Sequence, residues 1–321
     1  DDKGLSYKTK NIKSRYIGKG NSAYTYLNIL EAQVCVMTTP GLDVLQIKRS
    51  KGVQHYSYIP HSPIDMGKYK LYSFDCFDSI FLSGVHQERS IRTLEALRDT
   101  KRKQLVNAGC PYMDELAFRF DLEGNAIETG KNSTKTILIA PTWGENNFLK
   151  LFRSAPVKQL LEDGYEVIIR PHPQSYQSEP ELYAKIEAEL NMFGKLFWDD
   201  KPDNFLSLIK SDVLISDISG IIFDYAFVFE KPVITVTLNY DFLGQEANDL
   251  PYDVWELSVL DRIGKQINNT DVNNISNVIK IALSESNDRS SLQKLREESL
   301  YNYKKSGEII ASNLVEIMGR I

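Results

Sequence analysis

Polar and aromatic residues directly follow three apolar runs in the second half of the chain, and each run has the length and composition of a β-strand. If these strands are parallel, their carboxyl ends open on one edge of a sheet, where open α/β sheets bind their ligands. An aromatic ring, a guanidinium, an imidazole, a carboxylate and a hydroxyl would then share one crevice. That set of groups suits the pyrophosphate of a nucleotide. The candidate residues are Thr142, Trp143, Arg170, His172, Asp217, Ser219, Gly220 and Asp224.

Arg170 and His172 stand in the most informative segment, where each is followed by a proline. Proline lacks an N–H group and cannot continue a central strand, so Pro171 and Pro173 should end the strand and fix the directions of both side chains. Arg170 offers a fork of N–H donors to phosphate oxygens. His172 can donate to a bridging oxygen or stabilise a leaving phosphate. The alternative is a salt-bridged Arg170 and a His172 that caps a helix.

Ser219 and Gly220 lie at the predicted start of a helix. Ser219 is a good N-cap residue, and Gly220 leaves room for a close ligand. The free N–H groups of the first helical turn and the positive end of the helix dipole attract phosphate. Plain capping is the alternative, and the two interpretations are compatible. Asp224 either binds the donor's ribose or holds the loop, and Trp143 is either a stacking platform or a packed side chain.

His61 is the candidate general base in the first half of the chain. It follows the predicted strand 53–59 and one proline, at a strand end that would face the second half. An unperturbed imidazole has a pKa near ~6.5, which suits removal of a proton from a hydroxyl. A turn or capping histidine is the alternative. His55 lies inside the strand and His86 opens a helix, so both are interpreted as structural.

Several common site motifs are absent from the sequence. A Walker A loop, a GxGxxG fingerprint and a G-x-S-x-G elbow are missing, which disfavours NTPases, dinucleotide dehydrogenases and serine hydrolases. There is also no HExxH motif, no Cys/His cluster and no Asp-x-Asp. We therefore expect no metal site and no required cofactor, with a nucleotide-activated donor as the substrate.

Short β-rich runs alternate with helical stretches, a pattern typical of parallel sheets covered by helices. Polar, turn-rich residues 122–133 resemble a linker. We therefore predict two doubly wound α/β domains that face a central cleft. These are an acceptor-side domain at 1–125, whose abrupt start suggests missing upstream sequence, and a nucleotide-donor-binding domain at 134–321. The strands predicted in the second half are 136–140, 166–170, 195–198, 213–216 and 232–236.

The last helical stretch, from about residue 291, carries four apolar residues on one face at helical spacing: Ile310, Leu314, Ile317 and Ile321. We expect the last helix to pack back across the domain junction. The elements predicted in the first half are strands at 12–17, 34–38, 53–59 and 105–108, and helices at 23–30, 73–82 and 86–98.

The composition is ordinary for a soluble protein of two domains, with 321 residues, 42% hydrophobic and 25% charged. The net charge of -5 argues against a bulk nucleic-acid binder. Cys35, Cys76 and Cys110 lie far apart in or beside apolar runs, as in a reduced cytoplasmic protein. No apolar run is long enough to span a membrane. We expect a cytoplasmic protein that has no nucleic-acid partner.

Several segments together resemble the CDP-glycerol glycerophosphotransferase family, whose members build the polyol-phosphate chains of wall teichoic acids and related capsules. The resemblance covers residues 134–318 well and the first half more loosely. It implies the GT-B fold, with the donor in the C-terminal domain and the acceptor on the N-terminal side. It also implies work at the inner membrane face without a span. The segments are IAPTW (139–143), IIRPHP (168–173), LISDISGIIFDYAF (214–227), KPVI (231–234) and YKKSGE (303–308).

The resemblance also implies roles for single residues. His61 matches the family's base, and Arg170 and His172 match residues that contact the donor phosphates. Asp217 and Ser219 match its serine-rich loop.

Two positions depart from the family pattern. Ser62 and Pro63 stand where the family commonly has Gly-Thr, and Gly220 stands where a hydroxyl residue is frequent.

The leading hypothesis is phosphoryl transfer. A base at His61 removes a proton from a hydroxyl of a polyol-phosphate, lipid-linked or glycan acceptor, the oxygen attacks the β-phosphorus of a CDP-polyol, and CMP leaves. One alternative is a glycosyltransferase of the same fold that uses a CMP- or UDP-sugar in capsule synthesis. Another is a non-catalytic binding module.

Overall fold

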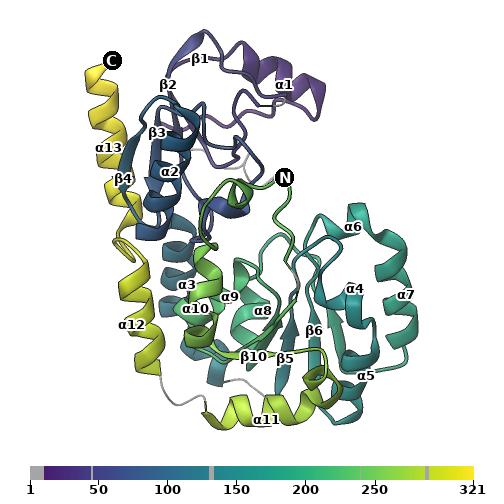
Figure 1. Ribbon diagram of the computed structural model, residues 1–321. Helices are drawn as coiled ribbons and strands as arrows, with labels where there is room; N and C mark the ends of the chain where they lie inside the picture. The colour runs from purple at the N-terminus through teal and green to yellow at the C-terminus, as the bar shows by residue number, and fades with distance from the viewer. Residues whose placement is uncertain (1–10, 45, 130–133, 239, 286–288) are drawn as a thin grey trace.

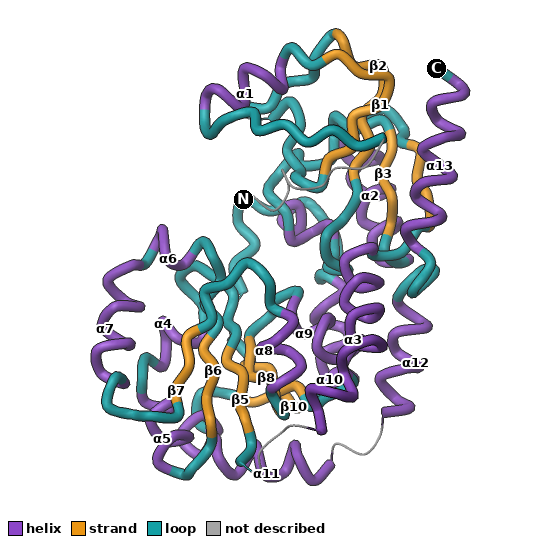
Figure 2. The backbone as a smooth tube through the Cα atoms, turned by 180° about the vertical axis from the view of Figure 1, so that it is seen from behind, coloured by secondary structure: helices purple, strands orange, loops and turns teal. Residues whose placement is uncertain are grey.

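The structure is a computed structural model that describes residues 11–44, 46–129, 134–238, 240–285 and 289–321. Its strands form two all-parallel sheets, one from the first part of the chain and one from the rest (Figures 1 and 2). The mixed α/β architecture that the alternating pattern predicts is therefore confirmed.

The N-terminal sheet has the order β1-β2-β3-β4, so the strand order does not reverse among the described strands. Successive residues of a strand point to opposite faces. Ile80 and Leu82 accordingly pack with Ile91 in one core, whereas Phe81 packs with Val106 in another. The elements of this part are α1 (Asn21–Asn28), β1 (Glu31–Met37), β2 (Gly52–Tyr58), η2 (Met66–Lys68), β3 (Ser79–Leu82), α2 (Val85–Arg98) and β4 (Gln104–Asn107).

The C-terminal sheet has the order β10-β9-β8-β5-β6-β7. From β5, the chain adds strands first on one side (β6, β7) and then on the other (β8, β9, β10), so the strand order reverses between β5 and β8. Ile137 and Ile139 face one core, and Leu138 and Ala140 face the other, so both sides of the sheet are covered. The strands are β5 (Thr136–Ile139), β6 (Glu166–Ile169), β7 (Leu196–Trp198), β8 (Val213–Ser216), β9 (Val233–Val236) and β10 (Lys265–Ile267).

The helices of the C-terminal part cover both faces of this sheet (Figure 1). They are α4 (Phe148–Phe152), α5 (Ala155–Glu162), α6 (Ser175–Ser178), α7 (Pro180–Leu190), α8 (Phe205–Lys210), α9 (Ile221–Asp224), η3 (Tyr225–Phe229), η4 (Glu246–Asn248), α10 (Trp255–Ile263), η5 (Asp271–Asn274), α11 (Ile275–Glu285) and α12 (Arg289–Ser299).

Two helices cross between the halves. Helix α3 (Pro111–Thr129) follows the N-terminal sheet, yet its buried residues Met113 and Leu116 belong to a core of the C-terminal sheet. Helix α13 (Ser306–Arg320) ends the chain but packs Ile310 and Ile317 against the N-terminal sheet. This packing agrees with the expectation that the last helix returns across the domain junction. The division into domains at 1–125 and 134–321 stays a prediction.

The five strands predicted in the second half are confirmed within one residue, and β10 was missed. The predicted helix 73–82 is wrong, because this segment forms turns followed by β3. All four residues of β3 are buried, and a strand buried on both faces shows no alternation that would reveal it.

The predicted linker and the first predicted strand also differ from the structure. Residues 122–129 continue α3, because its buried first half anchors a polar continuation of the helix, and residues 130–133 of the predicted linker lie outside the described residues. Residues 12–17 form no strand among the described residues.

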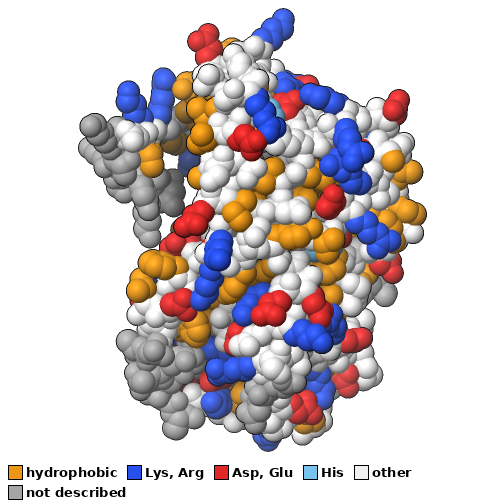
Figure 3. Space-filling model, turned by 90° about the vertical axis from the view of Figure 1, so that its left-hand side faces the viewer, with side chains coloured by type: hydrophobic (Ala, Val, Ile, Leu, Met, Phe, Trp, Pro, Cys, Tyr) orange, Lys and Arg blue, Asp and Glu red, His pale blue; other side chains and the backbone are white. Residues whose placement is uncertain are grey.

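Figure 3 views the molecule from the side of α12 and α13. Acidic and basic side chains are interspersed over this face, so it carries no field of a single sign. The expected lack of a nucleic-acid partner stays a prediction.

Arg98, at the end of α2, joins the two halves. Its Nη2 lies 2.5 Å from a carboxylate oxygen of Glu246 and 2.7 Å from one of Asp249, and its Nη1 lies 3.0 Å from Asp75. Glu246 is fully buried, and its other oxygen accepts the N–H of Ser73 at 2.8 Å. These charges therefore hold the N-terminal half against the segment that precedes α10.

Replacing Arg98 by Met should cost about 3–5 kcal/mol in the free energy of unfolding, because it leaves a buried carboxylate unpaired. Urea unfolding followed by tryptophan fluorescence measures the change. Arg262→Met is the matched control, since Arg262 pairs with Glu298 at 2.6 Å but both side chains are nearly half exposed. The control should lose at most about 1 kcal/mol. Equal losses in the two variants would contradict a role for Arg98 in joining the halves.

Candidate active site

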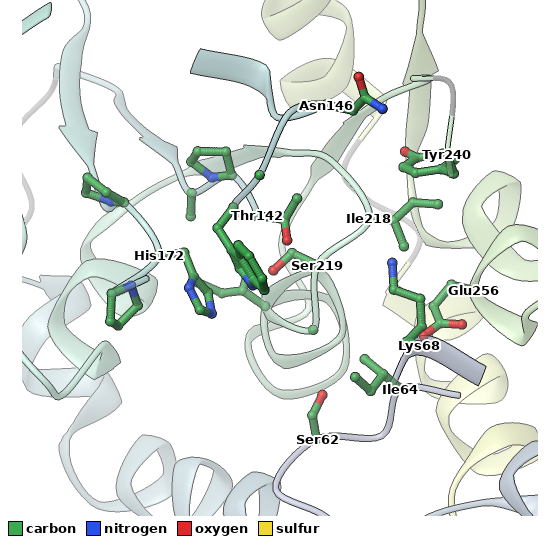
Figure 4. A pocket seen from close by; sticks show the side chains of 18 of the residues that line it. Ser62, Ile64, Lys68, Thr142, Asn146, His172, Ile218, Ser219, Tyr240 and Glu256 are labelled. Atoms are coloured by element: carbon green, nitrogen blue, oxygen red, sulfur yellow. The ribbon is translucent and has the colours of Figure 1, made fainter. Parts of the chain in front are cut away.

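A pocket of about 820 Å³ lies where the two halves meet and is lined by residues of both (Figure 4). Its wall on the C-terminal side is formed by the loops after β5, β6 and β8, which are neighbours in the sheet at the point of reversal. The volume lies within the range of roughly 300–1,000 Å³ that small-molecule sites occupy.

The structure brings almost all of the candidate residues into this pocket. The loops after β5 and β6 supply two residues each, the segment after β8 supplies three, and the loop after β2 of the other half supplies the candidate base. Asp217 is the candidate that does not line the pocket. The candidates in the pocket are Thr142, Trp143, Arg170, His172, Ser219, Gly220, Asp224 and His61.

Asp217 is fully buried and supports the loop after β5. Its carboxylate accepts the N–H groups of Thr142 at 2.7 Å and of Phe148 at 3.1 Å. Burial raises the pKa of Asp217 to about 6, and these backbone donors oppose the shift. The expected contact with a donor is not met, because the side chain points into the protein. Asp217 instead positions Thr142 and the residues beside it.

The segment after β8 begins α9, which continues without a break into η3. The N-cap is Gly220, and no side chain caps the helix, so the predicted capping role of Ser219 is wrong. Ser219 lines the pocket instead. The first backbone bond of the helix runs from the N–H of Ile222 to the carbonyl of Ser219, so the N–H groups before it have no helical acceptor.

Gly220 marks a close approach of the two halves. A Cβ atom on Gly220 would lie 2.6 Å from Oγ of Ser62 and 3.5 Å from a methyl carbon of Ile64. Ser62 Oγ is buried and has no hydrogen-bond partner among the described residues. The glycine therefore admits a serine hydroxyl from the N-terminal half in addition to any ligand.

Arg170 lines the pocket and is also salt-bridged. Its Nη1 lies 2.6 Å from Oδ2 of Asp199, and its Nη2 donates to the carbonyl of Pro202 at 3.4 Å. Asp199 also accepts a hydrogen bond from Ser207. Arg170 was interpreted either as a phosphate-binding residue or as a salt-bridged one. The two interpretations are compatible, because Asp199 fixes the guanidinium while Arg170 still lines the pocket.

His172 has a defined tautomer. Its Nδ1 accepts the N–H of Gln174 at 3.1 Å, so the neutral ring carries its proton on Nε2 and can donate from there. Partial burial lowers the pKa of His172. The ring of Trp143 lies 6.2 Å away and is 47% exposed, so it offers a face to a ligand beside His172.

His61 follows β2 and lines the same pocket from the N-terminal half. Partial burial lowers its pKa, and the backbone of Thr38 opposes the shift. Its ring lies 6.4 Å from that of Tyr69. A lowered pKa keeps the imidazole neutral near pH 7, which is the form that accepts a proton.

The other two histidines of the first half line no part of this pocket. His86 is buried, stacks on Trp255 at 4.0 Å and bonds through Nε2 to the carbonyl of Pro63 at 2.7 Å. Burial lowers the pKa of His86 to about 4. His55 bonds to Oγ of Ser79 at 2.9 Å. His86 thus supports the loop that carries His61.

Asp224 is buried beside the pocket, and its Oδ1 has no hydrogen-bond partner among the described residues. Burial raises the pKa of Asp224 to about 7. An unpaired acceptor in this place favours contact with a ligand hydroxyl over a purely structural role.

Sequence reasoning missed several residues of the pocket. Tyr240 lies in the segment after β9, and the others reach the pocket through long-range packing. No local pattern marks them. They are Lys68, Tyr112, Tyr240, Gln245 and Glu256. In the part of the chain that the structure describes, no group of three or more His, Cys, Asp or Glu residues could hold a metal ion. The expectation that no cofactor is required stays a prediction.

Comparison with known families gives one match, which spans most of the chain. The sequence model of the family described as CDP-glycerol:poly(glycerophosphate) glycerophosphotransferase matches residues 7–256. The chain belongs to this family. Membership makes it a transferase that uses CDP-glycerol, as the resemblance implied. A search of curated protein sequences finds no relative.

Solved structures show the same fold at low sequence identity. A variant of the wall teichoic acid polymerase TagF soaked with CDPG has 18% identity and a TM-score of 0.57, covering 93% of this chain and 74% of that one. The UDP-GlcNAc 2-epimerase of Methanocaldococcus jannaschii has 12% identity and a TM-score of 0.52, covering 82% and 69%. Both comparisons support the GT-B-like fold.

Gly220→Ala should lower turnover by roughly 10- to 100-fold, because the new Cβ displaces the loop that carries His61, and small misplacements of reacting groups have effects of this size. Initial rates with CDP-glycerol measure the change. Adding Ser62→Gly removes the atom that the new Cβ meets and should restore most of the rate lost. A double variant no more active than Gly220→Ala would contradict this steric account.

Proposed function

We propose that the chain transfers a glycerol phosphate, or a related polyol-phosphate unit, from a CDP-activated donor to an acceptor hydroxyl and releases CMP. The observation that carries this proposal is one pocket with His61 on one wall and Arg170 and His172 on the other. A base from the acceptor side and cationic or N–H donors from the donor side are what an in-line phosphoryl transfer needs.

In the proposed step, His61 removes the proton of the acceptor hydroxyl. The acceptor oxygen then bonds to the β-phosphorus of the donor, while the bond from that phosphorus to the bridging oxygen breaks. The electron pair of the broken bond goes to the oxygen that leaves with CMP. Arg170, His172 Nε2–H and the backbone N–H groups at the start of α9 stabilise the negative charge on the transferred and leaving phosphates. The proposal requires no cofactor.

The proposed acceptor is a growing teichoic acid or capsule polymer, either as a polyol phosphate or on a lipid-linked or glycan primer. The fold shared with the wall teichoic acid polymerase TagF supports this setting. None of the described helices has both the length and the apolar character that crossing a bilayer requires. We propose a cytoplasmic protein that works peripherally at the inner membrane face.

A sugar nucleotide is the alternative donor. The similar folds of UDP-GlcNAc 2-epimerases support it, but the family match favours phosphoryl transfer. Product analysis separates the two, since phosphoryl transfer leaves a phosphodiester in the product and releases CMP from CDP-glycerol. A binding module without activity would leave CDP-glycerol unchanged after long incubation with acceptor.

His61→Ala and His172→Ala should each reduce CMP release from CDP-glycerol by at least ~100-fold. A general base such as His61 contributes about 10²–10⁴-fold, and a donor to developing charge such as His172 contributes about 10²–10³-fold. Both variants should keep the thermal unfolding midpoint of the wild type within a few degrees. His55→Gln is the matched control, because His55 lies in β2 outside the pocket. Near-wild-type rates in either pocket variant would remove the role assigned to that histidine.

The pH profile of kcat/KM tests His61 independently. The base must be neutral, so activity should fall as pH drops through the pKa of His61. Since burial lowers that pKa, the acid limb should have its midpoint below ~6.5. A midpoint above that value would exclude His61 in this environment as the titrating base.

A further inference from the structure

Glu256, at the start of α10, is fully buried in the wall of the pocket. Its Oε1 accepts the N–H of Asp65 at 2.9 Å. Its Oε2 has no hydrogen-bond partner among the described residues. Figure 4 shows Glu256 beside Lys68, on the side of the pocket away from His172.

The position of Glu256 is fixed by Asp65, which lies in the loop after β2. The carboxylate of Asp65 accepts hydrogen bonds from the N–H of Gly67 at 2.7 Å, the hydroxyl of Ser90 at 2.8 Å and the N–H of Trp255 at 3.1 Å. Asp65 thus contacts the start of α10 twice, since its N–H donates to Glu256 and its carboxylate accepts the N–H of Trp255. The unpaired Oε2 is therefore held rigidly and is not a mobile surface group.

A buried acceptor without a partner costs free energy, and such groups in native proteins call for an explanation. Burial raises the pKa of Glu256 to about 7, the charge of Asp65 adds to the shift, and Lys68 opposes it. The amide oxygen of Gln245 is also unpaired and lines the same pocket. Oxygen acceptors repel phosphate oxygens, so this wall is suited to a ligand group that donates hydrogen bonds.

Lys68 supplies a positive charge beside these acceptors. Its ammonium lies 5.9 Å from the ring centre of Tyr240 and 5.8 Å from that of Phe242, and the residue lines the pocket. A ligand that fits this wall has a hydroxyl for the carboxyl group and an anionic group for the ammonium. A polyol phosphate carries both within a few bonds.

We propose that Glu256 and Lys68 form a subsite for the polyol-phosphate unit, in which Glu256 Oε2 accepts a hydrogen bond from a polyol hydroxyl and Lys68 faces the adjoining phosphate. The subsite rests on the proposed function and names residues that select the transferred or receiving unit. The same chemistry belongs to the polyol of the donor and to the terminal unit of the acceptor, and the experiment separates these sources.

Glu256→Gln is the decisive variant. The amide oxygen can still accept the N–H of Asp65, while an NH₂ group replaces the free acceptor. Calorimetry with CDP and with CDP-glycerol forms the donor arm, and the KM for a glycerol-phosphate oligomer forms the acceptor arm. The affinity for CDP should stay within about twofold of the wild type. Either the affinity for CDP-glycerol or the KM for the oligomer should worsen by roughly 10-fold, and the arm that changes identifies the source.

Glu145→Gln is the matched control, because Glu145 also lines the pocket but is exposed and paired with Lys150 at 2.6 Å. It should change neither arm. Unchanged values in both arms for Glu256→Gln would overturn the subsite, as would equal weakening of CDP and CDP-glycerol together with a lower unfolding midpoint. A wild-type protein that neither binds CDP-glycerol nor releases CMP from it would instead refute the proposed function itself.

Discussion

The parallel arrangement of the C-terminal strands is the constraint on which the rest of the structure depends. Parallel strands present their carboxyl ends on one edge, and the reversal between β5 and β8 separates the loops that follow them, which leaves a crevice. The loop after β5 is held in place by side chains of the protein itself. Asp217 holds this loop by binding two backbone N–H groups. Asp217 follows a strand end, as the candidate ligand-contacting residues do, but its carboxylate supports the neighbouring loop and does not line the pocket.

The site also requires that the N-terminal half is held against this crevice. Arg98 meets this requirement through three carboxylates, and Asp65 meets it by capping α10 while its own N–H binds Glu256. The crossing helices α3 and α13 add apolar contacts in both directions. The contacts of Asp75 with Arg98, of Ser73 with Glu246 and of Asp65 with Glu256 all involve the loop after β2. The position of His61 therefore depends on side chains more than 150 residues away in sequence, such as Glu256.

The sequence predicts the strand-end residues well because apolar runs and the prolines after β6 leave few local alternatives. It does not predict partners that only folding brings together. Asp199 follows β7, and nothing near Arg170 in the sequence indicates that the two side chains pair. Helix α3 was missed because its polar second half resembles a linker, although its first half is anchored by Met113 and Leu116. Glu256 has no local signal, since its environment comes from a loop of the other half.

The two departures from the family pattern become one feature once the structure is considered. Ser62 stands where the resemblance implies a glycine, and Gly220 stands where it implies a hydroxyl residue. These two positions face each other across the junction. A Cβ at position 220 would lie 2.6 Å from Ser62 Oγ, so a hydroxyl on one side excludes a side chain on the other. In this chain the hydroxyl stands on the N-terminal side of the contact and the glycine on the C-terminal side. Ser62 lines the pocket, and its Oγ is buried with no hydrogen-bond partner among the described residues, so the serine places an unsatisfied hydroxyl at the contact between the halves.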